Sequence, residues 1–177
     1  MERQVHGFIF EKSIIEKFNL IKEKSHTSEY DAHTSNNIPV QIKLEKENSD
    51  IEMADIFRNF LKKEDFILVV GFWKNNPLDI VKIYSVYFKI EDFKKNFDGK
   101  LLDDFSQFLE NITNNYSDDE KWKYQIKIFR KEWKSRTSNF IRPRFKRDHK
   151  NQKRIQCAIN NKDFINYWRN GGEFKWE

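Results

Sequence analysis

Four polar residues in the first quarter of the chain have side chains suited to chemistry at a metal ion. Glu11 lies in a segment with helical spacing of apolar residues, Asp31 follows it, and Gln41 and Lys43 stand in a segment of alternating polarity. Because side chains alternate along a strand, Gln41 and Lys43 should share one face while Ile42 points into the core. Carboxylate and amide oxygens suit a hard cation such as Mg²⁺, and a lysine ammonium can offset negative charge developing on a substrate.

These residues can act together only if the elements that carry them meet. Residues 38–44 alternate apolar and polar, which predicts a half-buried strand. Tyr30 and its neighbours are expected to form the partner strand, with the polar residues 33–37 as the turn between them. If residues 30–32 pair with residues 40–42, Asp31 is brought to the same end as Gln41 and Lys43.

This arrangement resembles the PD-(D/E)xK nuclease superfamily, and within it the type II restriction endonucleases. In that family a helical Glu, a strand Asp and an acid-x-Lys pattern on the next strand surround one or two divalent ions. The matching residues here are Glu11, Asp31, Gln41 and Lys43. The similarity covers roughly residues 5–90, including the order of elements around the motif.

The resemblance implies a sequence-specific, Mg²⁺-dependent endonuclease that hydrolyses double-stranded DNA in restriction defence, in a bacterial cytoplasm. Asp31 would be the main ligand of one or two Mg²⁺ ions, with Glu11 and Gln41 as further ligands. Lys43 would orient or help to deprotonate the attacking water and offset charge on the phosphate. Gln41 departs from the family's usual acid and predicts weaker metal binding, with Glu11 or Glu45 in compensation.

The charge of the chain is unevenly placed. Residues 121–155 contain 14 Lys and Arg but only two acids, Glu132 and Asp148, whereas the rest of the chain carries a net charge of −7. Such separation is typical of a face that binds a polyanion. The alternative is an ordinary solvated run of charge.

Within the basic segment, guanidinium and amide groups suited to base edges are mixed with lysines suited to phosphates. This mixture predicts a DNA-recognition segment at about residues 121–156, although an ordinary polar loop remains an alternative. The predicted DNA-binding residues are Arg142, Arg144, Lys146, Arg147, Lys150, Asn151, Gln152, Lys153, Arg154 and Gln156.

The pattern along the whole chain predicts a single α/β domain over residues 1–177, with a restriction-endonuclease-like core in which helices flank a mixed central sheet. Residues 139–151 are expected to be an irregular basic loop stiffened by Pro143. Helices are predicted over 8–24, 49–62, 101–112, 118–134 and 162–169, and strands over 38–44, 66–73, 80–90 and 154–159. For residues 118–134 a strand is the alternative, because apolar residues also alternate from Trp122 to Ile128.

Several classes of protein are not expected. There is no apolar run of membrane-spanning length, no signal-peptide pattern, no Walker loop and no Gly-rich dinucleotide turn, so neither a membrane nor a nucleotide cofactor is predicted. The one cysteine, Cys157, is expected to be buried and inert. A histidine-based metal site near His26 and His33 is a minor alternative.

Three rival functions remain open at the level of sequence. A structure-specific DNA repair nuclease would share the same core, a non-catalytic DNA-binding protein would be consistent with Gln41, and an RNA-binding protein would share the basic segment. A palindromic DNA target would imply a homodimer, because the symmetry of the protein then matches that of the DNA.

Overall fold

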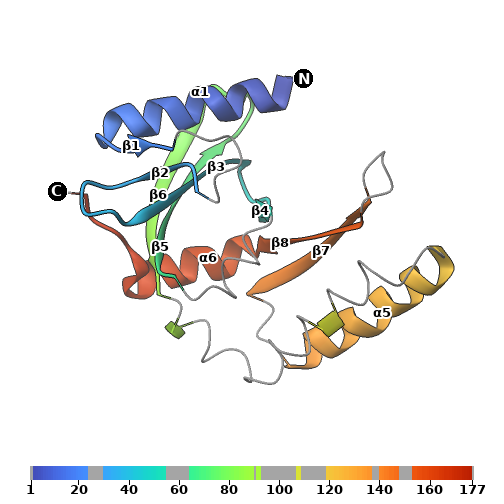
Figure 1. Cartoon of the computed structure of the whole chain (residues 1–177). Helices are drawn as coiled ribbons and strands as arrows, with labels where there is room; N and C mark the ends of the chain where they lie inside the picture. Colours follow the sequence, from blue (N-terminus) through green and yellow to red (C-terminus); the bar gives the residue numbers. More distant parts are fainter. Residues whose placement is uncertain are drawn as a thin grey trace.

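The computed structural model describes residues 2–23, 30–54, 64–89, 91–92, 107–108, 119–136, 140–147 and 153–176. They form an α/β fold built on a five-stranded mixed sheet and a second, three-stranded sheet (Figure 1). The mixed α/β class predicted from the sequence is therefore confirmed. None of the helices within the described residues combines the length and the apolar character needed to cross a membrane.

The five-stranded sheet has the order β1-β2-β3-β5-β6. Its centre is the parallel pair of β3 (Pro39–Lys46) and β5 (Phe66–Trp73). The antiparallel strand β6 (Ile80–Phe88) lies beyond β5, and the two-residue strands β1 (Ile21–Lys22) and β2 (Ala32–His33) extend the sheet past β3. Strand β5 is buried along almost its whole length because both faces of the sheet are covered.

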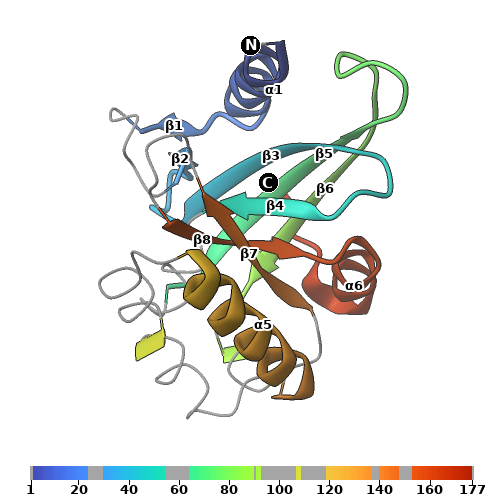
Figure 2. The same ribbon diagram turned by 90° about the vertical axis from the view of Figure 1, so that its right-hand side faces the viewer.

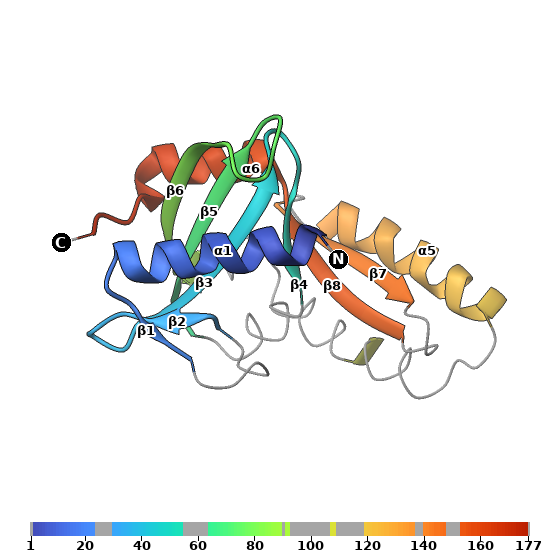
Figure 3. The same cartoon turned by 90° about the horizontal axis from the view of Figure 1, so that it is seen from above.

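Helix α1 (Glu2–Lys17) covers one face of this sheet, where Phe10 and Ile14 pack against Val40, Ile42 and neighbouring residues. Helix α6 (Asn161–Tyr167) and the short π-helix η1 (Trp168–Gly172) lie on the opposite side, as the view from above shows (Figure 3). The C-terminal residues Phe174 and Trp176 return to the α1 side and pack there.

The second sheet has the order β4-β8-β7, formed by β4 (Ile51–Ala54), β8 (Lys153–Ile159) and β7 (Ile141–Arg147). It shares a core with the face of the first sheet that α1 leaves uncovered, and helix α5 (Asp119–Arg136) contributes to that core (Figure 2). Residues contributed by the second sheet and by α5 include Ile51, Met53, Phe129, Trp133, Ile141, Cys157 and Ile159.

The helix predicted from residue 49 is wrong over its first residues, which form the strand β4. The Ser49 hydroxyl donates to the Lys46 carbonyl within a turn, and the Glu52 backbone N–H donates to the Glu45 carboxylate, so neither residue acts as a helix cap. Pairing of β4 with β8, about a hundred residues away, decides the conformation, and no local signal carries that information. Residues 55–63 of this prediction lie outside the described residues.

The irregular loop predicted over residues 139–151 is also wrong where the structure describes it, because residues 141–147 form β7. Pro143 had suggested a loop, since proline cannot donate a ladder hydrogen bond. It is accommodated because β7 is the edge strand of its sheet and needs partners on one side only.

The first helix is displaced from its predicted span of 8–24. It begins at Glu2, and it ends at Lys17 because Asn19 adopts a positive φ of 50° that stops the helix. The predicted strands at 38–44, 66–73, 80–90 and 154–159 are confirmed within a few residues, as are the helices at 118–134 and 162–169. The predicted helix over 101–112 lies outside the described residues except for Gln107 and Phe108.

Candidate active site

Asp31 lies where the five-stranded sheet narrows. Its backbone N–H donates to the Val40 carbonyl at 3.1 Å, which continues the pairing of β2 with β3. Among the described residues, β2 pairs only with Pro39 and Val40 of β3. From Gln41 onward, β3 therefore has a strand partner on one side only, which is β5. The Asp31 carboxylate takes the place of the missing strand and accepts the Ile42 N–H at 2.7 Å.

Gln41 and Lys43 lie on the same face of β3, as their spacing predicts. The core cluster beneath α1 contains Val40 and Ile42, so the alternate residues face the second sheet. Gln41 is buried, and its side-chain amide nitrogen donates to the Asp31 carboxylate. In this orientation the amide holds Asp31 in place.

Burial of the Asp31 carboxyl group raises its pKa above the usual range. The positive charge of Lys43 and the hydrogen bond from the Ile42 N–H lower the pKa, the nearby carboxylate of Glu11 raises it, and Lys22 lowers it. The net effect is upward, so the ionised Asp31 carboxylate is less favoured in the protein than in water. A cation bound beside Asp31 would favour the ionised form.

Glu11 reaches this site from α1. Its carboxylate forms an ion pair with Lys22 of β1 at 3.1 Å between Oε1 and Nζ. The Glu11 side chain is 18% exposed and that of Lys22 56% exposed, so the acid is sheltered and the base lies at the rim. Asp31 accepts a hydrogen bond from Gln41 and interacts electrostatically with Lys43, Glu11 and Lys22. The predicted residues Glu11, Gln41 and Lys43 therefore all act on the Asp31 carboxyl group, and Lys22 joins them.

Asp31 and Glu11 are the acids of this site that could hold a hydrated hard cation. In the described part of the chain no three His, Cys, Asp or Glu side chains converge to hold a metal ion, so Asp31 and Glu11 would supply two carboxylates. Mg²⁺ commonly binds to proteins through one or two carboxylates and keeps several of its waters. Gln41 could add a third oxygen only by rotating its amide group away from the bond with Asp31.

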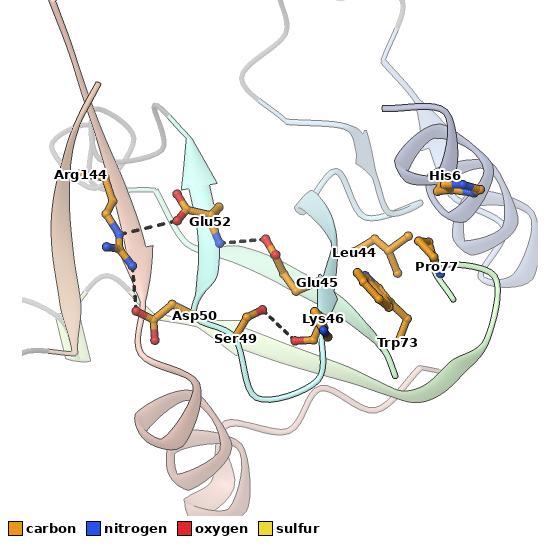
Figure 4. Close-up of a pocket in the computed structure, with 10 residues that line it drawn as sticks. All are labelled: His6, Leu44, Glu45, Lys46, Ser49, Asp50, Glu52, Trp73, Pro77 and Arg144. Atoms are coloured by element: carbon orange, nitrogen blue, oxygen red, sulfur yellow. Dashed lines mark hydrogen bonds and ion pairs between the residues drawn. The ribbon is translucent and has the colours of Figure 1, made fainter. Parts of the chain in front are cut away.

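A pocket of about 390 Å³ opens farther along β3 between the two sheets (Figure 4). Glu45, which shares the face of Lys43, lines it together with Lys46 and Trp73 at the ends of β3 and β5. Asp50 and Arg144 form part of the opposite wall. The pocket is thus lined both by β3, the strand that carries Gln41 and Lys43, and by the basic strand β7.

Two arginines of β7, Arg142 and Arg144, are held by acids at the start of β4. One oxygen of Asp50 accepts from Arg142 at 3.2 Å and from Arg144 at 2.9 Å, and the Nε of Arg144 lies 3.6 Å from Glu52. Both arginine side chains remain about two-fifths exposed. Arg144 lines the pocket and can reach a ligand there, but both arginines share their charge with Asp50.

The other predicted DNA-binding residues belong to β7, to β8 and to the segment of the sequence between these two strands. Gln156 is half-buried on β8 opposite Arg144, while Lys146 pairs in register with Arg154 and Arg147 with Lys153. The side-chain positions of these four basic residues lie outside the described part of the structure. Lys150, Asn151 and Gln152 lie outside the described residues altogether.

Helix α5 carries basic residues that the sequence placed in the same segment. Its buried side consists of Trp122, Ile126, Phe129 and Trp133. At spacings of four, three and four residues, four cations form a row along one exposed side of the helix. This row, termed the α5 basic row below, consists of Lys123, Lys127, Arg130 and Lys134.

Sequence reasoning missed Lys22 and Asp50. Lys22 lay within the predicted first helix, and the signal that could have corrected this was Asn19, a residue type that commonly stops helices. Asp50 had been taken as part of a helix start, and nothing local identifies it as the partner of two arginines more than ninety residues away.

Comparison with known proteins adds no relative to this picture. No protein-family model matches the chain, and no curated protein matches it in sequence. The geometry of the described residues is therefore the basis for assigning a function.

Proposed function

We propose that the protein is a Mg²⁺-dependent endonuclease that cuts double-stranded DNA at a specific site, with a core like that of the restriction endonucleases. The observation that carries the proposal is the environment of Asp31. A partly buried carboxylate at the free edge of β3 has Lys43 and Gln41 on one side and Glu11 of α1 on another. Buried acids close to one another and to a lysine are typical of sites that bind cations and transfer protons.

In this proposal Asp31 and Glu11 hold the cation through their oxygens, and Gln41 keeps Asp31 aligned or adds its own oxygen. When bound, the ion supplies a water of lowered pKa and stabilises charge on the phosphate. The ammonium of Lys43 orients the attacking water and offsets the negative charge that develops on the phosphate oxygens. Attack of that water on phosphorus breaks the bond to the leaving sugar oxygen, which then takes up a proton.

DNA would be bound by the basic residues of α5, β7 and β8. The α5 basic row, together with the basic residues of β7 and β8, offers charge for phosphates. Arg144 lines the pocket farther along β3 from Lys43, and Arg142 shares its partner Asp50. A palindromic target would be read by a symmetric homodimer.

The test is incubation of the protein with plasmid and phage DNA in Mg²⁺, followed by sequencing of the ends. Discrete fragments with a common end sequence are expected. The Lys43→Ala variant should lose cleavage by at least about a hundredfold, in the range found when a group that stabilises transition-state charge is removed, while it retains DNA binding.

Lys12→Ala is the matched control, since Lys12 is exposed on α1 and pairs only loosely with Glu16 at 3.9 Å. It should cut as the wild type does. Absence of cleavage of any DNA by the wild type in Mg²⁺ or Mn²⁺ would contradict the enzymatic proposal.

One observation favours a second candidate, a DNA-binding protein without catalysis. Gln41 is neutral and donates to Asp31, so the site contains one acid fewer than the resemblance implies. Specific binding of duplex DNA without cleavage would establish this alternative, and cleavage confined to branched DNA would instead indicate a repair nuclease.

A further inference from the structure

The charges of the candidate active site cancel when both of its acids are ionised, as they would be to hold a cation. Glu11 and Asp31 contribute two negative charges, Lys22 and Lys43 contribute two positive charges, and Gln41 contributes none. Because the two acids and the two lysines cancel, a single added divalent ion is enough to make the site positive and so able to bind an anionic substrate. Lys22 accounts for the balance, because without it the site would carry a negative charge.

Lys22 is fixed in place by the backbone around Asp31. Strand β1 pairs Lys22 with Ala32 directly after Asp31, and the Glu23 N–H donates to the Asp31 carbonyl at 3.2 Å. The Lys22 ammonium then lies 3.1 Å from the Glu11 carboxylate. One short strand therefore places a cation beside the acid that α1 contributes.

We propose that Lys22 is a positioning residue that holds Glu11 beside Asp31 and occupies the place of a second cation, so that the site binds one divalent ion per chain. This inference rests on the proposed function. A second divalent ion would have to displace Lys22 from Glu11 and would find only the same two carboxylates, since no third acid or histidine joins them among the described residues. Ions in two-metal sites lie about 3.5–4 Å apart and share ligands from several acids.

The experiment counts bound Mn²⁺ by isothermal titration calorimetry and records the electron paramagnetic resonance spectrum of the bound ion. The wild type is expected to bind one Mn²⁺ per chain with the spectrum of an isolated ion. Lys22→Met should bind Mn²⁺ about tenfold more tightly or take up a second, spin-coupled ion, because a unit charge a few ångströms away is removed. The half-exposed position of Lys22 makes a folded variant the expected product.

Two further variants separate charge from shape. Lys22→Arg keeps the positive charge and should retain one ion with nearly the affinity of the wild type. Lys12→Met, on the outer side of the same helix as Glu11, should leave both affinity and stoichiometry unchanged.

The outcomes distinguish this inference from the proposed function. Two coupled ions in the wild type, or identical Mn²⁺ binding by the wild type and Lys22→Met, would overturn the role of Lys22 while cleavage by the wild type still stood. Absence of both Mn²⁺ binding and cleavage would overturn the proposed function and this inference together.

Discussion

The Asp31 carboxylate is held by two donors of the strand beside it, the backbone N–H of Ile42 and the side-chain amide of Gln41. These contacts fix the position of the carboxylate but do not fully compensate for its burial, because the pKa of Asp31 remains raised. Charged groups that are imperfectly stabilised in the protein alone are characteristic of sites that acquire a ligand.

The raised pKa of Asp31 makes a prediction about stability and pH. Because the folded protein binds the Asp31 proton more tightly than the unfolded chain does, the Asp31 contribution to stability falls as pH rises from the unfolded pKa through the folded pKa. Asp31→Asn, which keeps an acceptor for Ile42, should therefore be more stable than the wild type at pH 7 in EDTA. The gain should shrink below pH 4, as measured by urea denaturation.

A control for this prediction is the addition of Mg²⁺. It should raise the melting temperature of the wild type and have little effect on Asp31→Asn, because a ligand that binds only the folded state stabilises it. A less stable Asp31→Asn variant at pH 7 would contradict the electrostatic account.

At the scale of elements, α1 is placed by a close approach to β5. The ring of Phe10 occupies the space in which a Cβ atom at Gly71 would lie. This contact holds α1 against the sheet at the residue next to Glu11, and so helps to determine how Glu11 approaches Asp31.

Gly71→Val should lower the free energy of unfolding by about 1–3 kcal/mol, the usual cost of overpacking a core. It should also weaken Mn²⁺ binding, because displacement of α1 moves Glu11. Gly7→Ala is the matched control, because a Cβ at Gly7 meets nothing within 4 Å and alanine is favoured over glycine in a helix by about 1 kcal/mol. Equal stabilities of the two variants in chemical denaturation would contradict this packing.

The C-terminal residues secure the other edge of the same sheet. Trp176 stacks on Phe18 with ring centroids 4.2 Å apart, and its indole N–H donates to the Ser85 hydroxyl at 2.8 Å. Glu173 forms an isolated bridge with Val86, so this segment covers part of the β6 edge.

Trp176→Ala should destabilise the protein by about 2 kcal/mol, less than the 3–5 kcal/mol typical of a fully buried tryptophan, because Trp176 is only half-buried. The exposed neighbour provides a control, since Lys175→Ala should change stability by less than about 0.5 kcal/mol. Thermal melts of both variants test the prediction, and a Trp176→Ala variant as stable as the wild type would show that the tail contributes no packing energy.

At the scale of the whole molecule, positive charge and the candidate active site come from different parts of the chain. The site is built from the first fifty residues, whereas the cations of α5 and β7 come from residues after 119. The pocket between the two sheets lies where β3 and β7 approach each other, with Glu45 of β3 and Arg144 of β7 in its lining (Figure 4).

If the α5 basic row contacts DNA phosphates, its neutralisation should reduce the dependence of binding on salt. Replacement of Lys123, Lys127 and Lys134 by Gln should lower the magnitude of the slope of log K against log[salt] by up to about three, at about 0.9 for each lost phosphate contact. Fluorescence anisotropy with a labelled duplex at several salt concentrations measures this slope. The control replaces Lys12, Lys17 and Lys175, which are exposed elsewhere, and an equal change in both triple variants would contradict a specific role for α5.

Some of the architecture is determined by the sequence itself. Three elements follow from local patterns: the continuous apolar run of β5, the alternation in β3 and the helical spacing of the large apolar residues of α5. Each pattern predicts its element because the apolar residues must lie on the face that is buried in the core. The hairpin pairing of Ala32 with Val40 was also predictable, since only a short turn separates them, and it brought Asp31 to Gln41.

Other features depend on partners distant in the sequence. Strand β4 forms because Ile51 and Met53 enter a core shared with β8, and β7 tolerates Pro143 because it lies at a sheet edge. The pairing of Lys22 with Glu11 likewise requires a helix that stops at Lys17 and a strand that begins at Ile21. Local propensity cannot specify such contacts, because their free energy arises only when segments far apart in the chain are buried against each other.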